Sequence, residues 1–360
     1  MQSALTIVAY HYVRNLQYSR YPEIKGLSTD DFEEQIQYIK KHYNVISGPE
    51  LMDAIVEGAP LPPRPLILTF DDGYIDHFTD VFPVLDRENL PGCFFPPAKC
   101  ILEHEVLNVN KIQFVLASTP DKRTLVEYIF KQIDDNRSRY NLLTSSAYWE
   151  KLGTPGRFDP AEVIFCKRIL QRELHPELRQ AITDELFSRY VTSDEATFSR
   201  ELYMSADQIQ VLERYGMYVG SHGYDHFWLN TLSTQQQESE IDQSLMFLKS
   251  VGADDRRWIM CYPYGAYDES LLSVLKSRNC VIGLTNKIGL ASLDKNNALV
   301  LPRIDTNDLP KDSNAGVNEW TFKASESLEG RANRALHRMA IPLYSIAADE
   351  LGSLAALISM

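Results

Sequence analysis

The feature that most constrains the fold of this chain is an alternation of short apolar segments with amphipathic ones. Residues 5–10 and 66–70 have the pattern of buried strands, and segments with helical spacing follow them. The same rhythm returns later in the chain, with strands expected at residues 217–220, 258–262 and 281–284. Strands that alternate with helices form parallel sheets with the helices packed outside. The sequence therefore predicts an α/β fold built on a parallel sheet.

A helical region interrupts this alternation. Residues 102–203 are rich in charge and contain no clear strand. Within them, Val126, Ile129, Phe130 and Ile133 fit one face of a helix. We interpret the region as an insertion that covers one side of the sheet; a separate second domain is the alternative. The expected division is 1–101 and 204–310 for the two parts of the α/β domain, 102–203 for the helical insertion and 311–360 for a C-terminal helical tail.

Composition and charge narrow the class of protein. The chain has 360 residues, of which 44% are apolar, enough for a sizeable core. Lys and Arg number 36, and Asp and Glu number 49, so the net charge is −13. Nucleic acids and anionic membranes bind basic patches, so this charge disfavours both as main partners.

The cysteines and the N-terminal residues indicate a reducing compartment. The five cysteines are scattered and form no C-x-x-C pair, which is typical of free thiols rather than of disulfides or thiolate metal sites. The first residues, MQSALTIVAYHYV, lack the basic and apolar regions of a signal peptide, and no apolar run is long enough to cross a membrane. We therefore expect a soluble, cytoplasmic protein without a transmembrane segment, and leave its oligomeric state open.

Polar clusters follow three of the expected strands. Asp71 and Asp72 come directly after the strand that ends at Phe70. Residues 221–226 (Ser-His-Gly-Tyr-Asp-His) and residues 263–265 (Pro-Tyr-Gly) follow two later strands. Ligand sites in parallel sheets lie at the carboxyl ends of the strands. We therefore expect the three clusters to converge on one opening.

His222 and His226 have the spacing of metal ligands. On a helical turn, residues four apart place both imidazoles on one face, where both can reach one ion. Asp71 or Asp72 would complete a set of two histidines and one carboxylate, which leaves open positions for water and substrate. The other aspartate could then take a proton from the bound water. Taken singly, these elements also fit caps, turns and loops; their joint order favours a catalytic metal site.

This series of motifs resembles the polysaccharide deacetylase family, the NodB-homology carbohydrate esterases. The motifs are Thr-Phe-Asp-Asp-Gly at residues 69–73, the pair His222 and His226, and Tyr-Pro-Tyr-Gly at residues 262–265. The resemblance covers roughly residues 4–100 and 203–310 and leaves out the helical insertion and the tail.

The resemblance implies a distorted (β/α) barrel of about seven strands and a divalent metal ion, commonly zinc. By correspondence of positions, Asp71 is the catalytic base, and the metal ligands are Asp72, His222 and His226. In such a site the metal and the base activate a water that attacks an acetamide carbonyl. The metal and a backbone N–H near Tyr264 hold the oxyanion. The products are acetate and a free amine.

The sequence departs from the family pattern at two places. Cys261 stands where many members have an arginine that orients the base, and Arg303 or Asp305 could take over that task unless they form a surface ion pair. The late Leu-x-His of many members, whose histidine protonates the leaving amine, has no convincing copy, because His337 falls in a helical, charged context. His11 follows the first strand and is the histidine that we expect in the pocket.

These observations favour a cytoplasmic, metal-dependent de-N-acetylase that acts on an N-acetylated sugar. The missing signal peptide favours a nucleotide- or lipid-linked intermediate of bacterial surface polysaccharide assembly, such as O-antigen or capsule, within lipopolysaccharide biosynthesis. A diphosphate on that substrate would call for basic residues at the mouth, with Lys99, Lys111 and Arg157 as candidates. Aromatic residues beside the motifs could stack on sugar rings or pack in the core. They are Tyr74, Tyr224, Phe227, Trp228 and Tyr264.

Two alternatives stay open at this stage. The first is a deformylase or a small-amide amidohydrolase on the same scaffold, which release of formate rather than acetate would distinguish. The second is a non-catalytic carbohydrate-binding protein, which the absent arginine and the absent late histidine would favour. The intact Asp71, Asp72, His222 and His226 argue against it.

Overall fold

A curled parallel sheet forms the centre of the molecule. The computed structural model describes residues 4–156 and 159–325. Within these residues the strand order is β5-β4-β3-β1-β8-β7-β6, and every pair along it is parallel. The strands are β1 (Thr6–Tyr10), β3 (Pro65–Asp71), β4 (Cys93–Phe95), β5 (Tyr218–Val219), β6 (Trp258–Cys261), β7 (Cys280–Ile288) and β8 (Leu301–Asp305), while the short β2 (Asn44–Val45) pairs with the start of β3. The predicted α/β class with a parallel sheet is confirmed.

The two outer strands of the sheet, β5 and β6, meet and close it into a distorted barrel. Ser221, just after β5, forms a parallel bridge with Met260 in β6. The Ser221 N–H donates to the Ile259 carbonyl at 3.0 Å, and the Cys261 N–H donates to the Ser221 carbonyl at 2.8 Å. Few residues take part in this contact because β5 is only two residues long. The distorted (β/α) barrel that the family resemblance implies is therefore confirmed.

The alternation of side chains along the strands builds the interior of the barrel. Ile67 of β3, Ile259 of β6 and Leu301 of β8 belong to one buried apolar cluster. Side chains two residues apart point to the same face of a strand. Asp71, Cys261 and Arg303 lie on the same faces as those residues, at the carboxyl ends of their strands. Their side chains therefore surround one end of the barrel interior.

Helices pack on the outside of the sheet. α1, for example, begins where the Ser28 hydroxyl accepts from the Asp31 N–H, and it buries Phe32, Ile36 and Ile39. The barrel helices are α1 (Thr29–His42), α2 (Gly48–Val56), the π-type segment η2 (His77–Val81), α3 (Phe82–Glu88), α11 (Ala206–Arg214), α12 (Thr234–Val251) and α13 (Glu269–Ser277). Short 3-10 segments are η1 (Leu16–Tyr18), η4 (Leu229–Thr231), η5 (Pro263–Gly265), η6 (Lys295–Val300) and η7 (Thr306–Asp308).

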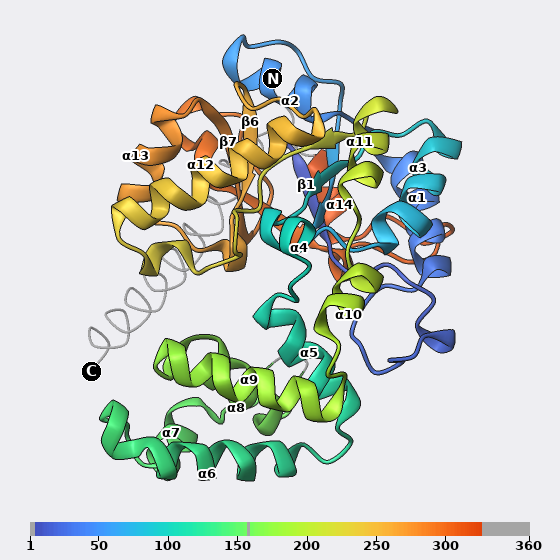
Figure 1. Cartoon of the computed structure of the whole chain (residues 1–360). Coiled ribbons are helices and arrows are strands. Elements are labelled where there is room, and N and C mark those ends of the chain that lie inside the picture. Colours follow the sequence, from blue (N-terminus) through green and yellow to red (C-terminus); the bar gives the residue numbers. More distant parts are fainter. Residues whose placement is uncertain (1–3, 157–158, 326–360) are drawn as a thin grey trace, which may run out of the picture.

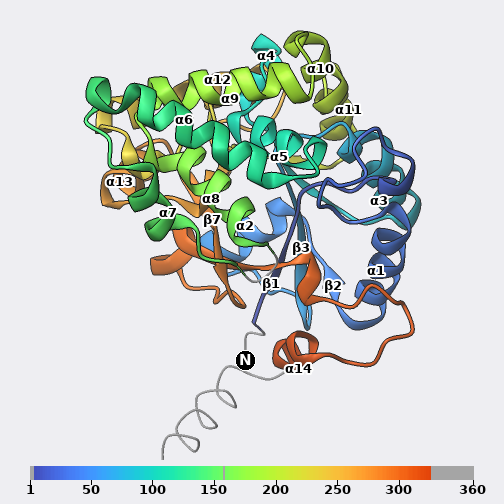
Figure 2. The same cartoon turned by 90° about the horizontal axis from the view of Figure 1, so that it is seen from below.

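Between β4 and α11, the regular elements of the described chain are all helical. The elements are α4 (Ala98–Glu103), α5 (Asn108–Ser118), α6 (Lys122–Tyr140), α7 (Ser145–Leu152), α8 (Ala161–Arg168), the π-type η3 (Ile169–Glu173), α9 (Pro176–Tyr190) and α10 (Glu195–Leu202). Of the four residues predicted for one face of α6, Val126, Ile129 and Ile133 are buried and Phe130 is partly buried. Figures 1 and 2 show α5 to α9 gathered on one side of the barrel. The exact division at residues 101, 203 and 310 stays a prediction.

The end of the described chain carries one more short helix, α14 (Glu319–Ser325). The rest of the predicted C-terminal tail, including His337, lies outside the described residues. All five cysteines are buried and unpaired, as expected from their spacing. Among the described helices, none has both the length and the apolar character needed to cross a membrane.

Candidate active site

Asp71 ends β3 and points into the mouth of the barrel, where Arg303 holds its carboxylate. Arg303 Nη1 donates to Asp71 Oδ1 at 2.9 Å, and Nη2 lies 2.8 Å from Oδ2. The guanidinium is itself fixed, because its Nε donates to the Thr285 carbonyl at 2.9 Å and its Nη1 to Thr69 Oγ1 at 3.2 Å. Two parallel bonds from a planar guanidinium set both the position and the plane of a carboxylate.

The pair of Arg303 and Asp71 shows how Asp71 is oriented although Cys261 stands where the family resemblance leads us to expect an arginine. The Cys261 Sγ lies 3.3 Å from Asp71 Oδ1, but the positive charge beside Asp71 comes from Arg303 on β8. Of the two candidates from the sequence, Arg303 makes the contact. Asp305 instead accepts from the Asn307 N–H at 2.9 Å and caps η7.

The environment of Asp71 keeps its carboxylate ionised. Asp71 is 1% exposed, and burial alone would raise the pKa of its carboxyl group. The Arg303 guanidinium, which is both the nearest charge and a hydrogen-bond donor, outweighs burial and holds the pKa of Asp71 below its usual range. The carboxylate is therefore ready to accept a proton at neutral pH.

Asp72 follows directly but points to different partners. Its backbone adopts φ 70°, in the left-handed region that few non-glycine residues occupy, and Gly73 follows at φ 67°. A Cβ on Gly73 would lie 2.7 Å from the Cβ of Pro96, so only glycine fits there. This tight turn separates two adjacent carboxylates, with Asp72 Oδ1 lying 3.3 Å from the Nε2 atoms of both His222 and His226.

His222 and His226 converge without the helical turn that the sequence reasoning assumed. Residues 222–228 form an irregular loop after β5, so that expectation is wrong. The bridge of Ser221 to β6 keeps the chain extended up to His222, and left-handed backbone at Gly223 (φ 77°) and His226 (φ 54°) then turns it back. The two rings end 4.8 Å apart.

The three side chains fit the donor set of a divalent metal ion. The ligand atoms of Asp72, His222 and His226 lie within 4.8 Å of one another. At metal–ligand distances of about 2.0–2.1 Å, tetrahedral ligands lie roughly 3.3–3.4 Å apart, close to the 3.3 Å between Asp72 Oδ1 and each Nε2. The Nδ1–H of His222 donates to the Cys261 carbonyl at 2.7 Å, which leaves Nε2 of the neutral ring to face the site.

A second set of candidate ligands, Asp71, His222 and Cys261, is less suitable. Burial raises the pKa of the Cys261 thiol, so the sulfur stays protonated, whereas metals bind the thiolate. Both oxygens of Asp71 already contact Arg303. Asp72 has no cationic side chain other than these histidines within ion-pair distance among the described residues.

A chain of hydrogen bonds connects Asp72 to the helical region, and sequence reasoning missed it. The Tyr74 hydroxyl donates to Asp72 Oδ2 at 2.7 Å. Asn110 of α5 is fully buried, and its Nδ2 donates to the Tyr74 hydroxyl at 2.7 Å. The Tyr203 hydroxyl donates to Asn110 Oδ1 at 2.6 Å. A lone Asn in a helix forms no motif, so nothing in the sequence pointed to it.

His11 and Tyr264 border the same cavity, which has a volume of about 370 Å³. His11 is half exposed, and its Nε2 lies 3.8 Å from Asp71 Oδ2. The Tyr264 ring packs edge-on against His226 at 4.8 Å and stacks on Trp228 at 4.3 Å. Within residues 4–156 and 159–325, no group accepts a hydrogen bond from the Tyr264 N–H. α5 adds Val109 and Gln113 to the lining, so the helical region borders the site.

Comparison with known proteins finds a family whose model matches part of the chain. Residues 186–281, which include both histidines and Tyr264, match the family model described as polysaccharide deacetylase. This part of the chain is therefore similar to the polysaccharide deacetylase family. The Bacillus subtilis (strain 168) protein named "Putative polysaccharide deacetylase YxkH" is 30% identical to this chain over 93 residues, or 26% of this chain and 33% of YxkH.

Two further relatives extend the comparison. The poly-beta-1,6-N-acetyl-D-glucosamine N-deacetylase of Escherichia coli (strain K12) is 35% identical over 72 residues, 20% of this chain and 11% of that protein. The match thus spans a third or less of either curated relative. The structure of the Streptococcus pyogenes deacetylase PplD in complex with acetate superposes with a TM-score of 0.56 at 16% identity, covering 91% of this chain and all of the other, which shows a shared fold.

Proposed function

We propose that this protein hydrolyses the acetamide of an N-acetylated sugar with the help of a divalent metal ion, for which zinc is the first candidate. The observation that carries the proposal is the division of labour between adjacent carboxylates. Asp72 faces His222 and His226, while Asp71 is held ionised and separately by Arg303. The name of the Escherichia coli relative, which describes an N-deacetylase of an N-acetylated glycan, supports the same reaction class.

A metal ion held by Asp72, His222 and His226 would lower the pKa of a water molecule and polarise the amide carbonyl. Asp71 lies beside that position and accepts the proton of the attacking water, because its carboxylate is ionised and its plane is fixed. The Tyr264 N–H, which borders the cavity, donates to the carbonyl oxygen as negative charge develops on it.

The leaving nitrogen needs a proton. His11 is the cavity side chain that we assign to this transfer, since its Nε2 lies 3.8 Å from Asp71 Oδ2 and can exchange a proton with that carboxylate. Acetate and the free amine are then the products.

The setting of the reaction is also part of the proposal. We infer a cytoplasmic enzyme that acts on a nucleotide- or lipid-linked intermediate of surface polysaccharide assembly, such as O-antigen or capsule. The five buried, unpaired cysteines support a reducing compartment.

The test is acetate release from a panel of N-acetylated sugars by zinc-loaded protein, with a chelator and with Asp71→Asn as controls. We expect release that stops with the chelator and falls strongly in Asp71→Asn. Formate release in place of acetate would favour the deformylase alternative. If metal-loaded, folded protein released neither acid from any substrate, the catalytic proposal would fail in favour of a binding role.

A further inference from the structure

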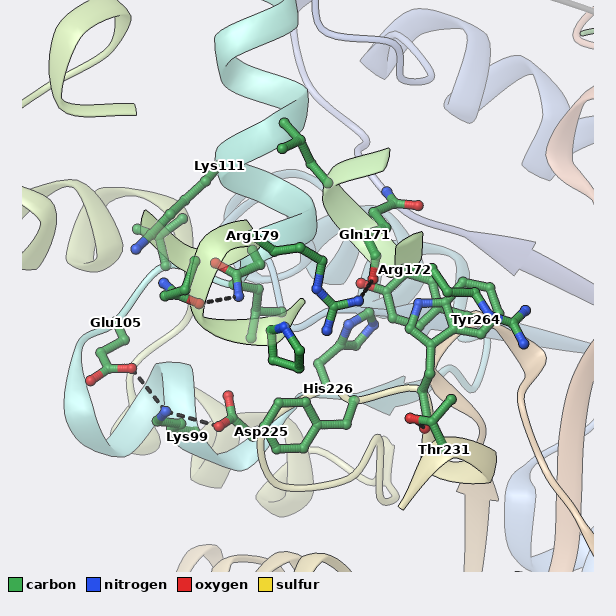
Figure 3. A pocket seen from close by; sticks show the side chains of 18 of the residues that line it. Lys99, Glu105, Lys111, Gln171, Arg172, Arg179, Asp225, His226, Thr231 and Tyr264 are labelled. Carbon is green, nitrogen blue, oxygen red and sulfur yellow. Dashed lines mark hydrogen bonds and ion pairs between the residues drawn. The ribbon is translucent and has the colours of Figure 1, made fainter. Parts of the chain in front are cut away.

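A second cavity adjoins the candidate active site and is not explained by the chemistry of deacetylation. Its volume is about 460 Å³, and it shares His226 and Tyr264 with the catalytic cavity. One wall comes from α5, η3 and α9 of the helical region, and the other from residues 225–231 after β5 (Figure 3). A substrate whose acetamide lies at Asp71 can therefore extend a neighbouring group between the barrel and the helices.

Four basic side chains line this cavity, and carboxylates neutralise two of them. Lys99 Nζ lies 3.0 Å from Glu105 and 2.9 Å from Asp225. Lys111 Nζ lies 2.6 Å from Asp184 and 2.8 Å from Glu195. Each lysine thus lies between two acidic groups. Two of the three candidates from the sequence, Lys99 and Lys111, line the cavity, but neither is available to bind an anion. The third, Arg157, lies outside the described residues.

Arg172 of η3 and Arg179 of α9 have no such partners. Within the described ranges, 4–156 and 159–325, neither guanidinium pairs with a carboxylate. Arg179 is half-buried, and its Nη1 donates to the Gln171 carbonyl at 2.7 Å. Burial lowers the pKa of Arg179, but a guanidinium remains protonated in proteins at neutral pH. A half-buried positive charge without a counter-charge is costly, and a bound anion would offset that cost.

The surroundings of the two arginines place them next to the reacting group. The Arg172 guanidinium carbon lies 5.0 Å from the centroid of the Trp228 ring, and this ring stacks on Tyr264. The Trp228 Nε1–H is buried and has no acceptor among the described residues, which adds a neutral donor beside the two cations. Figure 3 shows both arginines on the side of His226 and Tyr264, and the paired Lys99 on the other side.

We propose that Arg172 and Arg179 form a subsite for an oxyanion carried by the substrate next to its N-acetylated sugar, either a phosphate or a carboxylate. Guanidinium groups bind both kinds of oxyanion through paired N–H donors. This inference rests on the proposed function, because it places the anion one unit away from the acetamide that the catalytic cavity receives.

The catalytic test compares three substrates: a neutral N-acetylglucosamine oligosaccharide, an oligosaccharide in which a uronic acid adjoins N-acetylglucosamine, and UDP-N-acetylglucosamine. The variants are Arg172→Gln, Arg179→Gln and their combination. The matched control is Arg189→Gln, since Arg189 is exposed on the same helix α9 and does not line the cavity. We expect the double variant to lower kcat/KM for one charged substrate by about 10- to 100-fold, mainly through KM, with the neutral substrate unchanged.

A binding test stands independently of turnover. Zinc-loaded protein is titrated with inorganic pyrophosphate and with glucuronic acid while tryptophan fluorescence is followed. The subsite is supported if Arg189→Gln still binds a probe and the double variant does not. The probe that binds more tightly then identifies the oxyanion. The subsite is overturned if wild type binds neither probe, or if the double variant binds as well as wild type. Absence of acetate release from all substrates, with this binding intact, would instead count against the proposed deacetylation alone.

Discussion

The barrel and the helical region support the two adjacent aspartates in different ways. Asp71 is held by barrel strands alone, through Arg303 of β8 and Cys261 of β6. Asp72 is held from the barrel side by the histidine loop and from the helical side by Tyr74 and, behind it, Asn110. Asp71 thus has the positively charged Arg303 as its partner, whereas the partner of Asp72 on the helical side is the neutral phenol of Tyr74.

The difference explains how two neighbouring carboxylates take separate roles. Arg303 balances the charge of Asp71, so this residue stays ionised without a metal ion. Tyr74 donates one hydrogen bond to Oδ2 of Asp72 and supplies no positive charge. The charge of Asp72 therefore remains for a cation that His222 and His226 help to bind. The helical region is therefore part of the support of the metal site, as well as a wall of the cavity.

Replacing the charged partner of Asp71 should have the largest effect. In Arg303→Met, burial is no longer offset, so the pKa of Asp71 rises and the acidic limb of kcat/KM moves to higher pH. We expect kcat to fall by about 10²-fold or more because the base is also misoriented. Stability at neutral pH should fall by about 3–5 kcal/mol, since one buried partner is lost. Activity over a pH series and chemical denaturation measure both effects.

The sign of the pH dependence in wild type follows from the same pair. The folded-state pKa of Asp71 is lowered, so its contribution to stability is present above the unfolded pKa of about 4 and is lost as pH falls below it. Arg278→Met is the matched control, because Arg278 pairs with Asp242 at the partly exposed surface at 2.6 Å. If the pH dependence of kcat/KM and of stability in Arg303→Met equalled that of wild type, the assigned role of Arg303 would be contradicted.

Removing the hydrogen bond on the other side should affect metal binding instead. In Tyr74→Phe, Asp72 loses the donor to Oδ2, and we expect zinc affinity to fall by about 10- to 100-fold. The pH profile should keep its shape once zinc saturates, because Asp71 is untouched. Competition with a fluorescent zinc chelator measures the affinity. An affinity equal to that of wild type would show that Tyr74 does not orient Asp72.

The contribution of the helical region should be smaller and should depend on Tyr74. Asn110→Leu removes the donor to the Tyr74 hydroxyl while filling a similar volume. We expect zinc affinity to fall by about tenfold or less, since the effect passes through one more bond. Combined with Tyr74→Phe, the further loss should be small because both act through one chain of bonds. Fully additive losses in this double-mutant cycle would break the proposed connection.

Cys261 should matter least. Its thiol is a weak donor at 3.3 Å from Asp71, and Arg303 supplies the charge. We expect Cys261→Ala to change kcat by less than about threefold, with a loss of stability of about 1 kcal/mol for the removed buried sulfur. Steady-state acetate release measures the first and thermal denaturation the second. A loss of kcat comparable to that of Arg303→Met would mean that Cys261 does orient the base.

Much of the barrel could be predicted because local patterns determine it. The apolar runs around residues 66–70 and 258–262 formed parallel strands, and the polar residues that follow them met at one mouth. The two-residue periodicity of strands could also have singled out Arg303, which shares the interior face with Leu301 just as Asp71 shares it with Ile67. The sequence interpretation had offered Arg303 only as one of two candidates.

Other parts of the site depend on contacts between distant segments and left no local signal. The loop that carries His222 and His226 turns through left-handed backbone at His226, which its sequence does not require. Asn110 meets Tyr74 and Tyr203 only after the helical region packs on the barrel. The pairing of Lys99 and Lys111 with acidic residues likewise depends on tertiary packing. The sequence therefore did not show which basic side chains lack a carboxylate partner among the described residues.

Zinc binding by Asp71→Asn and Asp72→Asn, measured side by side with turnover of each saturated protein, tests the division of roles most directly. We expect Asp71→Asn to bind zinc within about threefold of wild type while losing turnover by about 10²-fold or more. Changes to residues outside the ligand set lower metal affinity by up to roughly 100-fold. Asp72→Asn removes a proposed ligand and should therefore lower zinc affinity by more than that. If instead Asp71→Asn lost zinc and Asp72→Asn retained it, the ligand set proposed here would be contradicted.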